Sequence, residues 1–183
     1  MPVFGPASIA LVTQAVKEGD SVALPGVGGT AKVMEVPGHT EEHIAFLYET
    51  HLFCGDTLFA GGCGRLLGSS TAAQLHASLQ RIASLPDETQ IHCAHEYTLS
   101  NLRFAKVIEP DNVALQARLV RCRAQREQHI PTLPSRLAEE RATNPFLRTA
   151  QADVRKAVEL HTATSLPDTD DVFAAMRAWK DSF

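Results

Sequence analysis

The pattern of apolar residues along the chain changes near residue 96, and this change constrains the fold more than any other feature. Up to that point the apolar runs are short, rich in β-branched and aromatic residues, and separated by glycine and proline. Such runs predict strands, here over residues 21–24, 31–36, 44–48, 51–54 and 89–93. We therefore expect the first half of the chain to form a sheet.

Two kinds of helical signal accompany the strands. Within the first half, Thr71 is followed three residues later by Gln74, the pattern of a capping box, and Leu75, Leu79 and Ile82 then recur at helical spacing. After residue 97, helical spacing dominates and predicts helices over 102–108, from Asp111 to about 127, and over 135–141, 152–160 and 170–180. The fold class is thus α/β, with an α/β domain over residues 1–96 and an all-α domain over 97–183.

Composition excludes several classes of protein. The 183 residues are 44% hydrophobic and 21% charged, with a net charge of −4, which is typical of a globular protein and argues against a nucleic-acid partner. No apolar run approaches the roughly 20 residues of a membrane span. The start has no secretory signal, and the four cysteines show no disulfide spacing. We expect a cytoplasmic monomer with no membrane partner.

Three polar residues follow predicted strands. His39 lies in PGHTEEH, Asp56 in CGDT and His95 in CAHEY. Loops at strand ends hold functional groups on a rigid sheet, and imidazole and carboxylate donors suit zinc or a similar metal. The alternative is that these histidines, like most of the eight in the chain, are surface or core residues. We expect His43, which directly precedes a strand, to be structural.

Four segments, in this order, closely resemble glyoxalase II, the hydroxyacylglutathione hydrolase of the metallo-β-lactamase superfamily: PGHTEEHI, LFCGDTLFAGGCGR, CAHEYTLSNLRFA and NPFLR. The resemblance runs from about Val3 to the C-terminus. It implies an αββα sandwich followed by a helical domain. It also implies hydrolysis of S-D-lactoylglutathione, a 2-hydroxyacylglutathione thioester, to glutathione and D-lactate in methylglyoxal detoxification.

The resemblance further implies a binuclear site holding Zn²⁺, with iron or manganese as alternatives. His39 would bind one metal and His95 the other, and Asp56 would bridge them. A metal-bound hydroxide would attack the thioester, so no protein residue is assigned as nucleophile. The chain has no G-x-S-x-G elbow, and Cys54 and Cys93 are expected to pack within strands.

Residues for substrate binding also follow from the resemblance. Arg65 and Tyr97 would contact glutathione, and Arg177 and Lys180 would bind its glycine carboxylate. The spacing of the last two places them one helical turn apart, where two cations can hold one carboxylate. The alternative is that two basic residues near a helix end only favour the helix dipole.

The main departure from the family lies upstream. Intact members carry a T-H-x-H-x-D-H motif, whereas residues 1–38 contain no histidine or cysteine and only one aspartate, Asp20. We therefore expect a truncated sandwich that lacks the ligands of this motif, is poorly stable and is impaired as an enzyme. A fragment, a misplaced start codon and a degenerate copy all fit the sequence.

Two other functions compete with the hydrolase. One is a non-catalytic pseudoenzyme or glutathione-binding remnant that keeps the cationic residues without a working metal pair. The other is a different enzyme of the same superfamily, such as a persulfide dioxygenase with a single iron. Metal analysis combined with a thioesterase assay separates the three.

Overall fold

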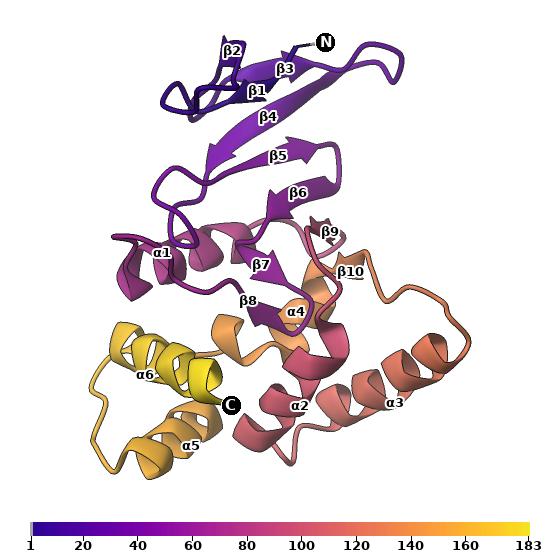
Figure 1. The fold of residues 1–183 in the computed structure, drawn as a ribbon. Helices are drawn as coiled ribbons and strands as arrows, with labels where there is room; N and C mark the ends of the chain where they lie inside the picture. Colours follow the sequence, from indigo (N-terminus) through magenta and orange to yellow (C-terminus); the bar gives the residue numbers. More distant parts are fainter. Residues whose placement is uncertain (1) are drawn as a thin grey trace.

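A six-stranded sheet forms the upper half of the molecule in a computed structural model that describes residues 2–183 (Figure 1). The strand order is β10-β9-β6-β5-β4-β3, and among the described strands of this sheet the pair β6–β9 is parallel while the other pairs are antiparallel. The strands are β3 (Ser21–Ala23), β4 (Thr30–Glu35), β5 (Ile44–Tyr48), β6 (His51–Gly55), β9 (Gln90–Cys93) and β10 (Ser135–Arg136). Two small pairs accompany it: β1 (Phe4–Gly5) with β2 (Gln14–Ala15), and β7 (Leu58–Phe59) with β8 (Gly62–Cys63).

Helices fill the lower half of the view (Figure 1). They are α1 (Ala72–Ala83), α2 (Thr98–Ile108), α3 (Val113–Glu127), α4 (Leu137–Thr143), the 3₁₀ turn η1 (Pro145–Leu147), α5 (Ala152–Thr162) and α6 (Thr169–Ser182). Helix α1 contacts α6, and α2 contacts α3. The predicted α/β fold class, with a C-terminal helical region, is confirmed.

The core lies between one face of the sheet and helices α1 and α6. Alternation along β6 explains which face is buried: Leu52 and Cys54 are fully buried, whereas Phe53, on the opposite face, is 47% exposed. The helices contribute fully buried side chains to the same cluster, among them Leu75, Leu79, Ile82, Phe173 and Met176. The C-terminal helix is therefore packed into the core of the sheet half.

Local sequence signals place α1 correctly. The backbone N–H of Gln74 donates to Thr71 Oγ1 at 3.2 Å, and the backbone N–H of Thr71 donates to Gln74 Oε1 at 2.8 Å. The capping box predicted from these two residues is confirmed. It fixes the start of α1 and, with it, the helical face that covers the sheet.

The second half departs from the prediction in two places. Helix α3 is capped by Asn112 rather than by Asp111, because Asn112 Oδ1 accepts from the Leu115 N–H at 3.0 Å while its Nδ2 donates to Ala142 O at 3.0 Å. Strand β10, which pairs antiparallel with β9, falls where a helix start was predicted. Residues after 96 thus add an edge strand to the sheet, and the domain division at 96/97 stays a prediction.

A buried charge network joins α3 and α4 to the turn between β7 and β8. The Glu140 carboxylate is fully buried, pairs with Arg118, and accepts from the Gly61 N–H at 2.8 Å. It also accepts from Asn144 Nδ2 at 3.1 Å. Asn144 Nδ2 lies within hydrogen-bonding distance of Phe59 O and Gly62 O as well. The network therefore fixes the β7–β8 hairpin against the helical region.

Gly38 packs the loop after β4 directly onto α1, which gives the first testable prediction. Its φ is +143°, and a Cβ at this position would lie 2.3 Å from Leu75 Cα. Gly38→Ala must shift backbone, so we expect it to lower the free energy of unfolding by about 2 kcal/mol more than a matched control. The control is Gly26→Ala, at φ +86° with nothing within 4 Å. Equal urea midpoints for the two variants would contradict the contact.

Candidate active site

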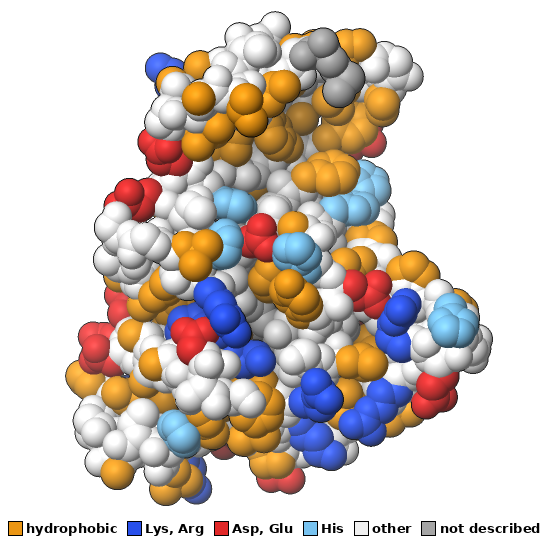
Figure 2. All heavy atoms as spheres, in the orientation of Figure 1, with side chains coloured by type: hydrophobic (Ala, Val, Ile, Leu, Met, Phe, Trp, Pro, Cys, Tyr) orange, Lys and Arg blue, Asp and Glu red, His pale blue; other side chains and the backbone are white. Residues whose placement is uncertain are grey.

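The seven predicted site residues line one pocket of about 610 Å³. It lies where the ends of the strands meet α2 and α6. On the face shown in Figure 2, histidine, acidic and basic side chains gather across the middle of the molecule. The seven residues are His39, Asp56, Arg65, His95, Tyr97, Arg177 and Lys180. The structure brings them together, and their individual roles remain predictions.

His39 stands in the loop between β4 and β5 and is fixed by a backbone carbonyl. Its Nδ1 lies 2.8 Å from Arg65 O. A carbonyl oxygen can only accept, so Nδ1 carries a proton, and in the neutral ring Nε2 then has a free lone pair. This is the tautomer that a metal-ligating or proton-accepting histidine requires.

Asp56 follows β6 in a turn that needs glycine before it. Gly55 has φ +53°, and a Cβ there would lie 2.4 Å from His43 Nε2. The backbone N–H of Asp56 donates to that same nitrogen at 3.1 Å. Burial is the main cause that lowers the pKa of His43, and it favours the neutral ring that can accept this bond. His43 thus has the structural contact expected from the sequence.

His95 is held by aromatic neighbours. Its ring stacks on Tyr97 with 5.0 Å between centroids, and Phe59 contacts Tyr97 edge-on at 5.3 Å. His95 Nε2 lies 3.4 Å from Asp56 Oδ1. Phe59 lines the pocket but was not predicted as a site residue, because nothing in the sequence distinguishes it from the other apolar residues.

The three predicted metal donors do not complete a metal centre. Asp56 and His95 approach each other, but His39 is fixed by Arg65 O, and its ring lies 5.7 Å from that of His43. Within residues 2–183, no group of three or more His, Cys, Asp or Glu side chains is placed to hold a metal ion. Zinc sites in proteins ordinarily use at least three protein ligands. The donors of this chain therefore fit only part of a metal site.

The cationic residues differ in how they face the pocket. The Arg65 side chain is 75% exposed, and the Lys180 Nζ lies 5.4 Å from the ring centroids of Phe104 and Phe183. Burial, followed by the charges of nearby arginines, lowers the pKa of Lys180. Arg177 is 4% exposed, and its NH1 donates to Cys63 O at 3.1 Å. Arg65 and Lys180 are thus the more available cations.

The cysteines near the site are poor nucleophiles. Burial raises the pKa of the Cys54 thiol to about 12 and that of Cys63 to about 11, and it also raises the pKa of Cys93. A thiolate is the reactive form, so these groups stay protonated at neutral pH. This agrees with the expectation that Cys54 and Cys93 only pack.

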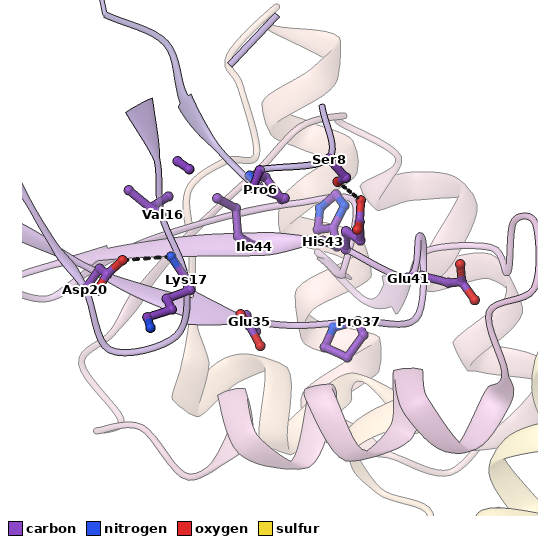
Figure 3. Close-up of a pocket in the computed structure, with 13 residues that line it drawn as sticks. Pro6, Ser8, Val16, Lys17, Asp20, Glu35, Pro37, Glu41, His43 and Ile44 are labelled. Atoms are coloured by element: carbon purple, nitrogen blue, oxygen red, sulfur yellow. Dashed lines mark hydrogen bonds between the residues drawn. The ribbon is translucent and has the colours of Figure 1, made fainter. Parts of the chain in front are cut away.

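A second pocket of about 460 Å³ lies between the β1–β2 pair and the loop after β4 (Figure 3). The backbone N–H of Lys17 donates to Asp20 Oδ2 at 2.9 Å, and Ser8 Oγ bonds to Glu42 on the opposite side. None of the seven predicted site residues lines it. The first pocket is therefore the candidate active site.

No helix in residues 2–183 combines the length and the apolar composition that crossing a bilayer requires.

Two known families match this chain, each over a different range of residues. Residues 5–95 match the metallo-beta-lactamase superfamily, and residues 96–183 match the family described as hydroxyacylglutathione hydrolase C-terminus. The hydroxyacylglutathione hydrolase of Nitrosomonas europaea is 48% identical over 185 residues, which cover all of this chain and 70% of that protein. The corresponding protein of Aeromonas hydrophila is 52% identical over 166 residues, or 91% of this chain and 64% of the relative.

Solved structures support the fold. The crystal structure of ETHE1 from Myxococcus xanthus matches with a TM-score of 0.59 at 23% identity, covering 98% of this chain and 65% of that one. A metallo-beta-lactamase from Staphylococcus aureus matches with a TM-score of 0.53 at 23% identity, covering 96% of this chain and 46% of that one. At this level of identity the likeness shows the fold alone.

Proposed function

The chain belongs to the hydroxyacylglutathione hydrolase family, and we propose that it takes part in the hydrolysis of S-D-lactoylglutathione to glutathione and D-lactate. The resemblance predicted from the four motifs is confirmed, and thioester hydrolysis of a glutathione derivative is the activity that the family name denotes. The observation that carries the proposal is the single pocket lined by all seven predicted residues.

Binding of the glutathione part is the role best supported for this chain. Glutathione carries two carboxylates, and the pocket offers the ammonium of Lys180 and the guanidinium of Arg65. Charge-assisted hydrogen bonds to a carboxylate are about twice as strong as neutral ones. We assign these two residues to ligand carboxylates, with the NH2 group of the more buried Arg177 beside them, and Tyr97 to a further contact.

The superfamily implies a divalent metal, and we propose that His39, Asp56 and His95 contribute to its site. Imidazole and carboxylate donors suit Zn²⁺, with iron or manganese as alternatives. The family resemblance implies that two such ions bind. A bound divalent cation supplies Lewis-acid polarisation of the thioester carbonyl. The donors that this chain would offer to the metal are Nε2 of a neutral His39 and the neighbouring side chains of Asp56 and His95.

Metal content provides a direct test of the donors. After dialysis we expect well under two equivalents of zinc per chain, because the described donors are too few for two closed sites. His39→Gln should lower the content further, whereas the matched variant His161→Gln should not, since His161 stacks on Trp179 away from the pocket. Two tightly held equivalents by elemental analysis would show that the donor set is complete.

Lys180→Ala tests the assigned substrate site. Removing one charge-assisted contact should raise the Kd for glutathione about tenfold, which corresponds to ~1.4 kcal/mol. The control is Lys156→Ala, an exposed lysine on α5. Titration calorimetry measures both affinities. An unchanged Kd for Lys180→Ala would make this residue a helix-end feature rather than a ligand contact.

The incomplete donor group favours a second candidate, glutathione binding without turnover. Under this alternative the zinc-supplemented protein binds glutathione, but it releases no thiol from S-D-lactoylglutathione above a Lys180→Ala background. Release of free thiol at a rate that depends on Lys180 supports the hydrolase. The test uses the two measurements on the same preparation.

A further inference from the structure

One carboxylate lies among the cations of the candidate active site. Asp181, in the last turn of α6, has its Oδ1 3.0 Å from Arg177 NH2 and 3.7 Å from Arg65 Nε. Its side chain remains 43% exposed. Its charge also acts on Lys180, where it opposes the lowering of the lysine pKa by burial and by the arginines. Asp181 thus pairs with two of the three predicted cationic ligand contacts, Arg177 and Arg65.

Arg177 leaves only one edge for an anion. Its NH1 is directed at Cys63 O at 3.1 Å and Gly64 O at 3.3 Å, and its Nε is buried. The remaining NH2 is the group that Asp181 occupies. A ligand carboxylate that approaches Arg177 would therefore share NH2, which has two N–H groups, with Asp181.

Asp181 also pairs with Arg65. In the described part of the chain, Asp181 is the one carboxylate paired with either Arg65 or Arg177. The Arg65 pair is long, exposed and therefore weak, so Arg65 can exchange one carboxylate for another at little cost. The ion pair between Asp181 and Arg177 is shorter, at 3.0 Å, and the Arg177 side chain is buried. Asp181 is thus held by the buried Arg177, while its exposed side chain lies beside Arg65, a residue that lines the pocket.

We propose that Asp181 is an internal competitor: it pairs with guanidinium groups of Arg177 and Arg65 that a carboxylate of glutathione would otherwise meet, and it thereby weakens the affinity of the pocket for glutathione. This inference rests on the proposed function. Glutathione has the same carboxylates as its thioester, so the product binds through the same contacts as the substrate. A built-in anion that raises the Kd of both limits product inhibition and favours release.

A competing role and a supporting role of Asp181 predict opposite changes in the affinity for glutathione when its charge is removed. If Asp181 only positioned Arg65 and Arg177 for the ligand, removing its charge would weaken binding. If it competes, removing its charge strengthens binding, because the pocket gains one net positive charge and a free guanidinium edge. The sign of the change in affinity therefore decides between the two.

The test is Asp181→Asn, which keeps the shape of the side chain and an oxygen that can accept from Arg177. By titration calorimetry at low ionic strength, we expect the variant to bind glutathione 3- to 10-fold more tightly, as an order-of-magnitude estimate. Glutathione monoethyl ester, blocked at the glycine carboxylate, should show no such gain. Asp153→Asn, exposed on α5, serves as the control. Unchanged or weaker binding of glutathione overturns the proposal.

Three other variants ensure that the experiment decides between the hypotheses. Asp181→Ser removes the charge with a smaller group and replaces Asp181→Asn if the amide variant does not fold. Lys180→Ala and Arg65→Ala test the proposed function by themselves: if both leave the affinity unchanged, glutathione binding in this pocket is wrong. If they weaken binding while neither Asp181 variant strengthens it, only the competitor role is wrong.

Discussion

Glu140→Ala is expected to lower the free energy of unfolding by about 3–5 kcal/mol, the range for breaking a buried ion pair from one side. The Glu140 carboxylate is fully buried and pairs with Arg118, whose side chain is only 2% exposed. Alanine leaves the guanidinium of Arg118 buried with only Glu139 and Thr143 nearby. It also leaves the Gly61 N–H without its acceptor.

Urea unfolding followed by circular dichroism measures this loss. Glu127→Ala, exposed near the end of α3, is the matched control and should stay within about 0.5 kcal/mol of the parent chain. Glu140→Gln should fall between the two, because an amide oxygen can still accept from Gly61. A variant already unfolded without urea agrees with the prediction. A Glu140→Ala midpoint equal to that of the control would contradict it.

This network also supports the candidate active site. Glu140 and Asn144 together hold the Gly61 N–H and the carbonyls of Phe59 and Gly62. Those residues form the β7–β8 hairpin, which presents Phe59 and Cys63 to the pocket. The segment NPFLR, one of the four motifs of the family resemblance, therefore has a structural role in this chain. Its asparagine fixes one wall of the pocket.

Local signals account for the parts of the fold that the sequence predicted. The capping box of α1 and the alternation along β6 involve residues a few positions apart, so their patterns are visible in the chain itself. His39, Asp56 and His95 each follow a predicted strand, which made them candidate donors, but their grouping in one site was implied by the family resemblance. The structure brings all three to the lining of one pocket.

Non-local contacts account for what could not be predicted. Strand β10 is two residues long and exists because β9 pairs with it, so no periodicity announces it. Arg177 and Lys180 have the predicted helical spacing, but the carbonyls that engage Arg177 come from a strand more than a hundred positions earlier. Asp181 likewise reads as an ordinary helix-end residue until Arg65 is placed beside it.

Asp56→Asn is expected to have the largest effect on function. Of the three proposed donors only Asp56 carries a charge, since His39 and His95 bind metals as neutral rings. Replacing a carboxylate by an amide removes the Coulomb attraction for a dication but keeps the side-chain shape and the backbone bond to His43. We expect the Kd for zinc to rise at least tenfold, as an order-of-magnitude estimate.

The same substitution should reduce hydrolysis of S-D-lactoylglutathione, measured at saturating substrate with zinc supplied, about a hundredfold or more, equivalent to ~3 kcal/mol. Asp153→Asn is the matched control on the exposed surface of α5. The zinc titration remains informative if the parent chain turns over too slowly to compare, because it depends on the donors alone. If Asp56→Asn binds zinc within about threefold of the control, the aspartate is a turn residue after β6. The proposed metal site then loses its only anionic ligand, and the pocket is better explained as a glutathione-binding site without metal chemistry.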